Sequence, residues 1–421
     1  MKKSKFKFYD IDVYSEKLDN GLEVYVIPNN NVKDVYVTFN TKYGGCNYNF
    51  KLNNKLIKVP NGIAHFLEHK MFEQEDGTDP FTFYNESGTY SNAYTNYFNT
   101  TYLFAGNTNI EENLNYLLDF VQSPYFTDSN VEKEKGIISE EIKMYEDMPD
   151  DVMMQKVMYN LFNSNPSKNS IIGTVSDIES ITKEDLYNTY NAFYHPSNMF
   201  LVITGNVDKN IIEVVKNNQK NKIFKENKVE IIKPKEKDSV YKEKEIIKHN
   251  VKMPLVAYSI KIPTKNINID KKKLNLYLSN LFNILFDDTS LFYEKMKDNN
   301  LLQIGVDIDN MDVEDYKIFI ISFRADNYNE VIKEIDCTLD NIIVDKKDLE
   351  RKKKVNLSDL LYIFDDINRT NKLVLNNIVL YDNIYLDIYD LIKEMNIEEL
   401  NNIIKNINLK NKSILVIESR D

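Results

Sequence analysis

An internal repeat narrows the range of folds open to this chain of 421 residues. The tripeptide Asn-Val-Lys precedes a predicted strand at Asn31 and again at Asn250. The segment LVITGNVD, which starts at Leu201, is echoed by LVIESRD, which starts at Leu415. The two offsets are 219 and 214 residues, which indicates a duplicated unit of strands and helices. Chance similarity among many β-branched residues is the alternative explanation of such short matches.

Strand and helix patterns alternate along the chain. Residues 22–28, 35–41 and 199–204 are short apolar runs rich in β-branched and aromatic residues, which predicts strands. Residues 112–122 and 184–194 carry apolar residues at helical spacing, which predicts helices. The repeat and this alternation together predict two duplicated α/β domains.

The length of the chain also favours two domains, since single domains seldom exceed about 250 residues. Residues 225–248 are rich in Lys and Glu and include Pro234, which is typical of a linker. The predicted division is therefore a first domain at 1–224, the linker at 225–248 and a second domain at 249–421.

Charge and cysteine content exclude several classes of protein. The formal net charge is −12, whereas a general nucleic-acid binder would be basic. The two cysteines, Cys46 and Cys337, form no disulfide framework and fit a reducing compartment. No apolar run follows the basic N-terminus, and no stretch approaches membrane-spanning length. We therefore expect a cytoplasmic protein.

Residues 62–69 read GIAHFLEH and hold two of the four histidines of the chain. On an α-helix His65, Glu68 and His69 share one face, because side chains three and four residues apart are neighbours. Two imidazoles and a carboxylate on one face can hold zinc and place a base beside it. The alternative is a surface helix that carries two histidines by accident.

A catalytic zinc site normally has three protein ligands, so a third one must lie elsewhere. Residues 132–146 form a predicted helix on which Glu134 and Glu141, two turns apart, share a face. Glu140 points about 100° away from Glu141 and is the next choice. Spacing alone leaves a charged solvent-exposed face as an equal alternative. The other two histidines are less suitable, since His195 precedes a proline and a buried strand.

Several segments in this order and spacing closely resemble the pitrilysin/insulinase family of zinc peptidases with an inverted His-x-x-Glu-His motif. They are residues 60–73, 92–95, 134–141 and 194–199. The nearest similarity is to the short bacterial two-domain members, which are related to the mitochondrial processing peptidase. The resemblance implies an α+β fold with two duplicated α/β-roll domains. Each would have a mixed, mostly antiparallel sheet packed by helices, and together they would form a half-shell.

The resemblance also implies roles for the motif residues. His65, His69 and Glu141 would bind one zinc ion per chain, and Glu68 would be the base that accepts a proton from water. Glu134 would support the centre without binding zinc.

Residues 88–98 resemble the edge strand to which substrate adds as a further strand in this family. Backbone hydrogen bonds to such an edge give affinity without demanding a particular sequence. Asn92 and Ala93 are the residues expected to contact the peptide, whereas most tyrosines of the segment are expected to be packing residues on a half-buried strand.

The second half lacks the metal-binding residues. Leu357 lies 216 residues after Glu141, at the place of the distal ligand, and the inverted motif does not recur. Active relatives use an arginine and a tyrosine of the inert half to hold substrate, but the matching positions here are Met296 and Gln303. We therefore expect a zinc-less paralogue to supply the missing pair in a heterodimer, with a homodimer as the alternative.

The sequence as a whole predicts a zinc metalloendopeptidase that hydrolyses extended peptides or leader segments within an enclosed chamber. The alternative from another class is a non-hydrolytic peptide-binding or scaffold subunit of a paralogous heterodimer. Four protein ligands on the metal would favour the scaffold, and three the peptidase.

Overall fold

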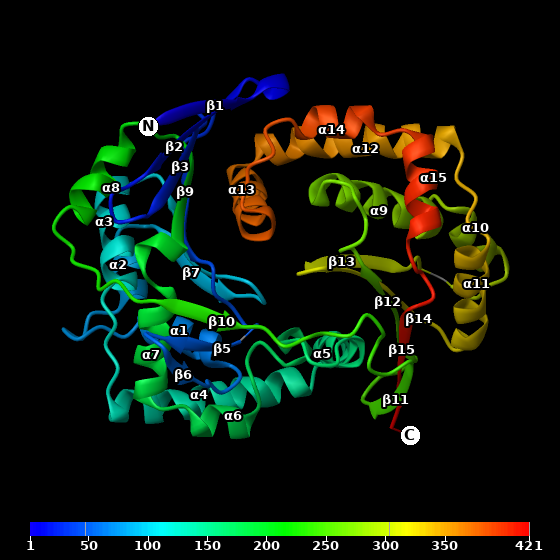
Figure 1. Ribbon diagram of the computed structural model, residues 1–421, viewed down its shortest axis with the longest axis horizontal. Helices are drawn as coiled ribbons and strands as arrows, with labels where there is room; N and C mark the ends of the chain where they lie inside the picture. Colours follow the sequence, from blue (N-terminus) through cyan, green and yellow to red (C-terminus); the bar gives the residue numbers. More distant parts are fainter. Residues whose placement is uncertain (47, 303, 421) are drawn as a thin grey trace. The chain divides into compact units, whose positions relative to one another are not determined.

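The computed structural model describes residues 1–46, 48–302 and 304–420, and it divides into two compact units (Figure 1). Each unit is assembled from three segments of the chain. The first unit consists of Met1–Lys143, Asn169–Lys233 and Leu361–Asp387. The second unit consists of Met144–Lys168, Pro234–Leu360 and the residues from Ile388 onward. Each unit therefore includes segments from both halves of the sequence.

The first unit is built on a seven-stranded sheet in the order β1-β2-β3-β9-β4-β8-β7. Neighbouring strands are antiparallel except β3 and β9, which are parallel. The predictions of strands are confirmed at β3, β4 and β9. The strands are β1 (Lys2–Phe6), β2 (Ile11–Lys17), β3 (Glu23–Pro28), β4 (Val35–Thr41), β7 (Tyr90–Thr95), β8 (Thr100–Gly106) and β9 (Met199–Gly205).

Helices and a small second sheet complete this unit. The small sheet has the order β10-β5-β6 and comprises β5 (Asn49–Leu52), β6 (Lys55–Ile57) and β10 (Val229–Ile232). The α-helices are α1 (Ile63–Met71), α2 (Pro80–Glu86), α3 (Ile110–Val121), most of α4 (Asp128–Glu146), α6 (Val175–Ser180), α7 (Lys183–Phe193), α8 (Ile211–Gln219) and α13 (Ile367–Tyr381). Short 3₁₀ helices are η1 (Lys7–Tyr9) and η3 (Pro196–Asn198). The predicted helices at 112–122 and 184–194 are confirmed as α3 and α7.

The second unit has a five-stranded sheet in the order β11-β15-β12-β14-β13. Its strands are β11 (Lys244–His249), β12 (Leu255–Pro263), β13 (Asp307–Val313), β14 (Tyr316–Arg324) and β15 (Lys412–Ser419). Its helices are α5 (Pro149–Leu161), η2 (Pro166–Lys168), α9 (Lys271–Phe286), α10 (Leu291–Asp298), α11 (Tyr328–Asp340), most of α12 (Lys346–Asp365), α14 (Ile388–Glu394) and α15 (Ile397–Asn406). In the described part of the chain, no helix combines the length and the apolar character needed to cross a bilayer.

The two main sheets share one topology. The order β3-β9-β4-β8-β7 in the first unit matches β11-β15-β12-β14-β13 in the second. In each of these five-strand orders, the first pair (β3 and β9, or β11 and β15) is parallel and the other neighbours are antiparallel. The repeated sequences flank or form β4 and β12, and β9 and β15, which are equivalent strands. The predicted duplication and the α+β class with mixed, mostly antiparallel sheets are thus confirmed.

The predicted linker contains a passage from the first unit to the second, between Lys233 and Pro234. The chain after this point is anchored by Lys261, whose buried ammonium donates to Glu236 Oε1 at 2.7 Å. The Glu236 carboxylate also accepts hydrogen bonds from the backbone N–H groups of residues 163–165. These contacts hold the segment within the second unit. The predicted domain boundaries stay a proposal.

The position of helix α1 is fixed by its packing in the hydrophobic core and by the glycine that precedes it. Ile63, Phe66 and Leu67 all belong to the hydrophobic core of the first unit. Gly62, directly before the helix, has a φ of +83°, and a Cβ there would lie 2.5 Å from the carbonyl oxygen of Ile172. Glycine is required because it tolerates both the left-handed conformation and the close approach. The path of the chain into α1 therefore has little freedom.

The two faces of the central strand β4 pack against different partners. Val37 and Phe39 belong to the hydrophobic core, whereas Thr38 between them points to the opposite face. There Thr38 Oγ1 donates to Asn371 Oδ1 of α13 at 2.8 Å. Asn371 Nδ2 in turn donates to the carbonyl oxygen of Val202 at 3.0 Å. Helix α13, which comes late in the sequence, is thus held on this sheet by buried polar contacts.

We expect Asn371→Ala to lower the free energy of unfolding by about 2–3 kcal/mol, because Thr38 and the Val202 carbonyl would stay buried without this partner. Urea denaturation followed by circular dichroism measures the change. Asn376→Ala, on an exposed position of the same helix, is the matched control. Equal effects of the two substitutions would contradict the docking role of Asn371.

Candidate metal centre

Helices α1 and α4 bring three potential metal ligands together. The Nε2 atom of His65 lies 3.8 Å from Glu141 Oε1, and the Nε2 atom of His69 lies 3.6 Å from Glu141 Oε2. One donor atom from each of the three residues lies within 4.8 Å of the others. Donors bound to one tetrahedral zinc at about 2 Å are separated by roughly 3.3 Å, so this set needs little adjustment. Two imidazoles and one carboxylate are a known catalytic zinc set, and the residues fit the ion.

The two imidazoles differ in environment. Burial is the main cause that lowers the pKa of His65 to about 3, and the charge of the neighbouring His69 acts in the same direction. The ring of His65 is therefore neutral, as metal binding requires. Burial also acts to lower the pKa of His69, but the hydrogen bond and charge of Glu134 outweigh it and raise that pKa above its usual value. The contact that causes this rise joins His69 Nδ1 to Glu134 Oε1 at 3.0 Å, and it also fixes the orientation of the ring. This arrangement leaves Nε2 directed to Glu141.

Glu134 lies beside the centre but outside the group of three. The hydrogen bond to His69 and the positive charges of His69 and Lys70 lower the pKa of Glu134, although its burial opposes this. Its carboxylate is thus kept ionised, as a hydrogen-bond acceptor from His69. This position agrees with the support role that was inferred for it, and the role itself stays a proposal.

Glu68 is the remaining carboxylate of the motif. It is buried, and burial raises its pKa, although a hydrogen bond from Thr95 partly opposes the rise. Thr95 Oγ1 donates to Glu68 Oε2 at 2.6 Å. Because Thr95 is the last residue of β7, this contact joins the end of the edge strand to the carboxylate. Sequence reasoning gave Thr95 no role; its place in the family-like segment 92–95 was the only signal.

Strand β7 lies at the end of the main sheet, and within the described residues it pairs with β8 alone. Asn92 is exposed on this strand, and its amide donates to the Tyr90 hydroxyl at 2.7 Å. The Asn92 side chain also accepts from the backbone N–H of Ala93 at 2.8 Å. Both residues are therefore on an accessible edge whose end contacts Glu68. That they bind peptide stays a prediction.

Three other predicted residues are not brought to the centre. Glu140 is exposed and accepts from Lys143 at 2.7 Å, so Glu141 is the carboxylate that faces the histidines. His195 instead caps η3, since its Nδ1 atom accepts a hydrogen bond from the backbone N–H of Ser197 at 3.2 Å. His249 contacts the carbonyl oxygen of Glu146 at 2.9 Å.

Two positions in the second half match those at which active relatives are expected to have an arginine and a tyrosine. Met296 is buried in the hydrophobic core of the second unit and offers no charged contact. Gln303 lies outside the described residues.

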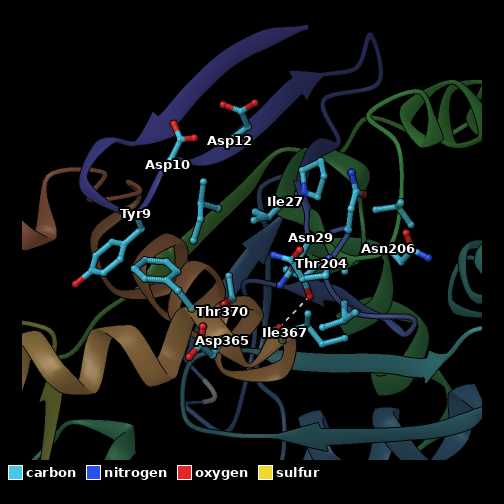
Figure 2. A pocket seen from close by; sticks show the side chains of 18 of the residues that line it. Tyr9, Asp10, Asp12, Ile27, Asn29, Thr204, Asn206, Asp365, Ile367 and Thr370 are labelled. Atoms are coloured by element: carbon cyan, nitrogen blue, oxygen red, sulfur yellow. Dashed lines mark hydrogen bonds between the residues drawn. The ribbon is translucent and has the colours of Figure 1, made fainter.

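The first unit also has an open polar cavity of about 1210 Å³ (Figure 2). It lies where the parallel strands β3 and β9 end, and Asn29 and Asn206 line it together with Asp12 and Asp365. Thr204 at its floor donates to the carbonyl oxygen of Ile367 at 2.9 Å. None of the motif residues of α1 or α4 lines this cavity, so it is separate from the metal centre.

Comparison with known proteins finds two matching family descriptions. Residues 58–175 match "Insulinase (Peptidase family M16)", and residues 180–356 match "Peptidase M16 inactive domain". The uncharacterized zinc protease YmfH of Bacillus subtilis is 35% identical over 408 residues, which is 93% of each chain. A probable mitochondrial-processing peptidase subunit beta of Arabidopsis thaliana is 32% identical over 37% of this chain and 30% of its own length.

Solved structures show the same similarity. The crystal structure of a putative M16-like peptidase from Alicyclobacillus acidocaldarius superimposes with a TM-score of 0.89 at 29% identity. The match covers 97% of this chain and 98% of that one. A protease from Helicobacter pylori, at 18% identity and a TM-score of 0.80, has the same fold.

We expect Thr95→Val to raise the pKa of Glu68 further, because the charged carboxylate loses a hydrogen bond that favours it. If Glu68 is the base that the sequence predicts, it must be ionised to act, so the acid limb of the pH profile of kcat/KM should move to higher pH. At acidic pH the loss of kcat/KM should be about tenfold. Peptide hydrolysis measured across pH 5–8 tests this, with Thr108→Val in an exposed loop as the control. An unmoved acid limb would show that Thr95 does not act on Glu68.

Proposed function

This chain belongs to the M16, or insulinase, family of peptidases, and from that premise we propose that it is a zinc-dependent metalloendopeptidase. The observation that carries the proposal is the group of His65, His69 and Glu141, with Glu68 one turn away on α1. Relatives of this chain are named zinc proteases, which supports zinc as the metal. One ion per chain is proposed, because only the first half carries the inverted motif.

Each residue of the centre has a distinct task in this proposal. His65, His69 and Glu141 would hold the zinc ion, and Glu134 would orient His69. When bound, zinc supplies a Lewis acid that polarises a carbonyl group and lowers the pKa of water. Glu68 would take a proton from the attacking water and deliver it to the leaving amine. A raised pKa suits this task, since a general base works best when its pKa lies near the working pH.

The proposed substrate is an extended peptide or a leader segment. It would add to the free edge of β7, where backbone groups can form hydrogen bonds without demanding a particular sequence. Asn92 and Ala93 would contact it there. The link from Thr95 to Glu68 supports this placement, because a peptide on β7 would lie next to the base. An enclosed chamber, formed with a second chain, is part of the proposal.

The partner is proposed to be a paralogue without zinc, with a second copy of this chain as the alternative. The support is negative: Leu357 stands at the place of the distal ligand, and Met296 is buried where active relatives are expected to have an arginine. A cytoplasmic location is proposed because a chain with only two cysteines, Cys46 and Cys337, has no disulfide framework and fits a reducing compartment.

We expect Glu68→Gln to lower the rate of peptide hydrolysis about 100- to 10,000-fold, because the amide cannot accept the proton. Zinc binding should persist, since Glu68 is not among the three ligands. Purified chain loaded with zinc is incubated with a mixed peptide library, and the products are read by mass spectrometry with Glu68→Gln as the blank.

Cleavage that is missing from the blank would establish the peptidase and show that this chain is sufficient. Zinc binding without cleavage would point to the missing partner, and adding a zinc-less paralogue should then restore activity. Near-normal turnover by Glu68→Gln would refute the assigned mechanism.

A further inference from the structure

A fully buried lysine follows the second histidine of the motif. Lys70 has 0% of its surface exposed, although it lies on the same helix as His65 and His69. A buried ammonium is costly unless carboxylates compensate its charge. The side chain meets two of them: Nζ contacts Glu73 and lies 3.5 Å from Glu134 Oε2.

Glu134 is therefore held at both of its oxygens. Oε1 lies 3.0 Å from His69 Nδ1, and Oε2 faces the ammonium of Lys70. On the opposite edge of the His69 ring, Nε2 lies 3.6 Å from Glu141. A chain of contacts thus runs from the lysine through Glu134 and the imidazole to the proposed metal ligands.

We propose that Lys70 is a positioning residue that fixes the Glu134 carboxylate and, through it, the orientation of His69 toward the metal. This inference rests on the proposed zinc site and assigns a task to a residue outside the inverted motif. The contact between the Lys70 ammonium and Glu134 Oε2 holds the Glu134 carboxylate on the Nδ1 side of the His69 ring. Partners of this kind behind a metal-bound histidine normally contribute to metal affinity.

The competing explanation is that Lys70 acts only as a nearby charge. A cation close to a divalent ion weakens its binding, so removal of the ammonium would then tighten zinc binding. Positioning predicts the opposite sign. Glu73 provides the matched control, because it is the other carboxylate of Lys70 but, within the described part of the chain, forms no ion pair with the three ligands. If charge alone mattered, removing the negative charge of Glu73 would weaken zinc binding, because an anion near a cation favours its binding.

The test is the zinc dissociation constant of the metal-free, full-length chain, measured by competition with a chromogenic chelator. We expect Lys70→Met to weaken zinc binding about 10- to 100-fold, as Glu134→Gln should also do. Glu73→Gln, whose side chain is partly exposed, should change it by less than about threefold. Lys70→Met should add almost nothing in the Glu134→Gln background, because both substitutions break one chain of contacts.

The absorption spectrum of the cobalt-substituted protein gives a second readout. It should change in Lys70→Met and stay unchanged in Glu73→Gln, since only the first alters the ligand geometry. Lys70→Gln is measured alongside and should act in the same direction, and thermal melts of the metal-free variants verify folding. Tighter or unchanged zinc binding in both Lys70 variants, or additive effects with Glu134→Gln, would overturn the proposal.

The cleavage assay separates this inference from the proposed function. If the unaltered chain binds zinc but cleaves nothing alone or with a paralogue, the peptidase proposal fails while the affinity pattern still tests Lys70. If the chain cleaves peptides and the affinity pattern is absent, only the role of Lys70 fails.

Discussion

The contact between α1 and α4 at which His69 meets Glu134 and Glu141 is the interaction on which the rest of the candidate centre depends. Both helices contribute to one hydrophobic core, through Phe66 and Leu67 on α1 and through Ile138 on α4. That packing sets the distance between the helices, because interiors are close-packed and adjust little. The polar groups then occupy a fixed geometry in which ligand atoms need little movement to share a metal.

Burial makes this centre electrostatically demanding, and each charge in it has a specific compensation. Glu68 receives a hydrogen bond from Thr95, while Glu134 lies between His69 and the ammonium of Lys70. Removing a partner from such a buried group costs more than losing an exposed ion pair, because the remaining group stays desolvated. The Thr95 contact also connects Glu68 to the edge strand β7, so in the proposed function peptide binding and proton transfer would share one rigid frame.

The duplication shows that topology alone does not create the chemistry. Both units have five strands in the same order, with the same parallel pair, yet the inverted motif occurs only in the first. The fold supplies equivalent positions, and side chains decide what each position can do. In the second unit, Met296 packs in the hydrophobic core.

The sequence by itself determined the face shared by His65, Glu68 and His69, the duplication and the central strands, because these depend on local periodicity. Residue spacing alone left Glu140 open beside Glu141, which the family resemblance favoured, and only helix packing shows which carboxylate faces the histidines. Thr95 and Lys70 acquire their partners in the same way: Glu68 and Glu134 are 27 and 64 residues distant along the chain. Likewise, α5 and α13 each join the unit that sequence order would not assign to them. Contacts between distant segments depend on how buried surfaces fit together, and no local pattern records that fit.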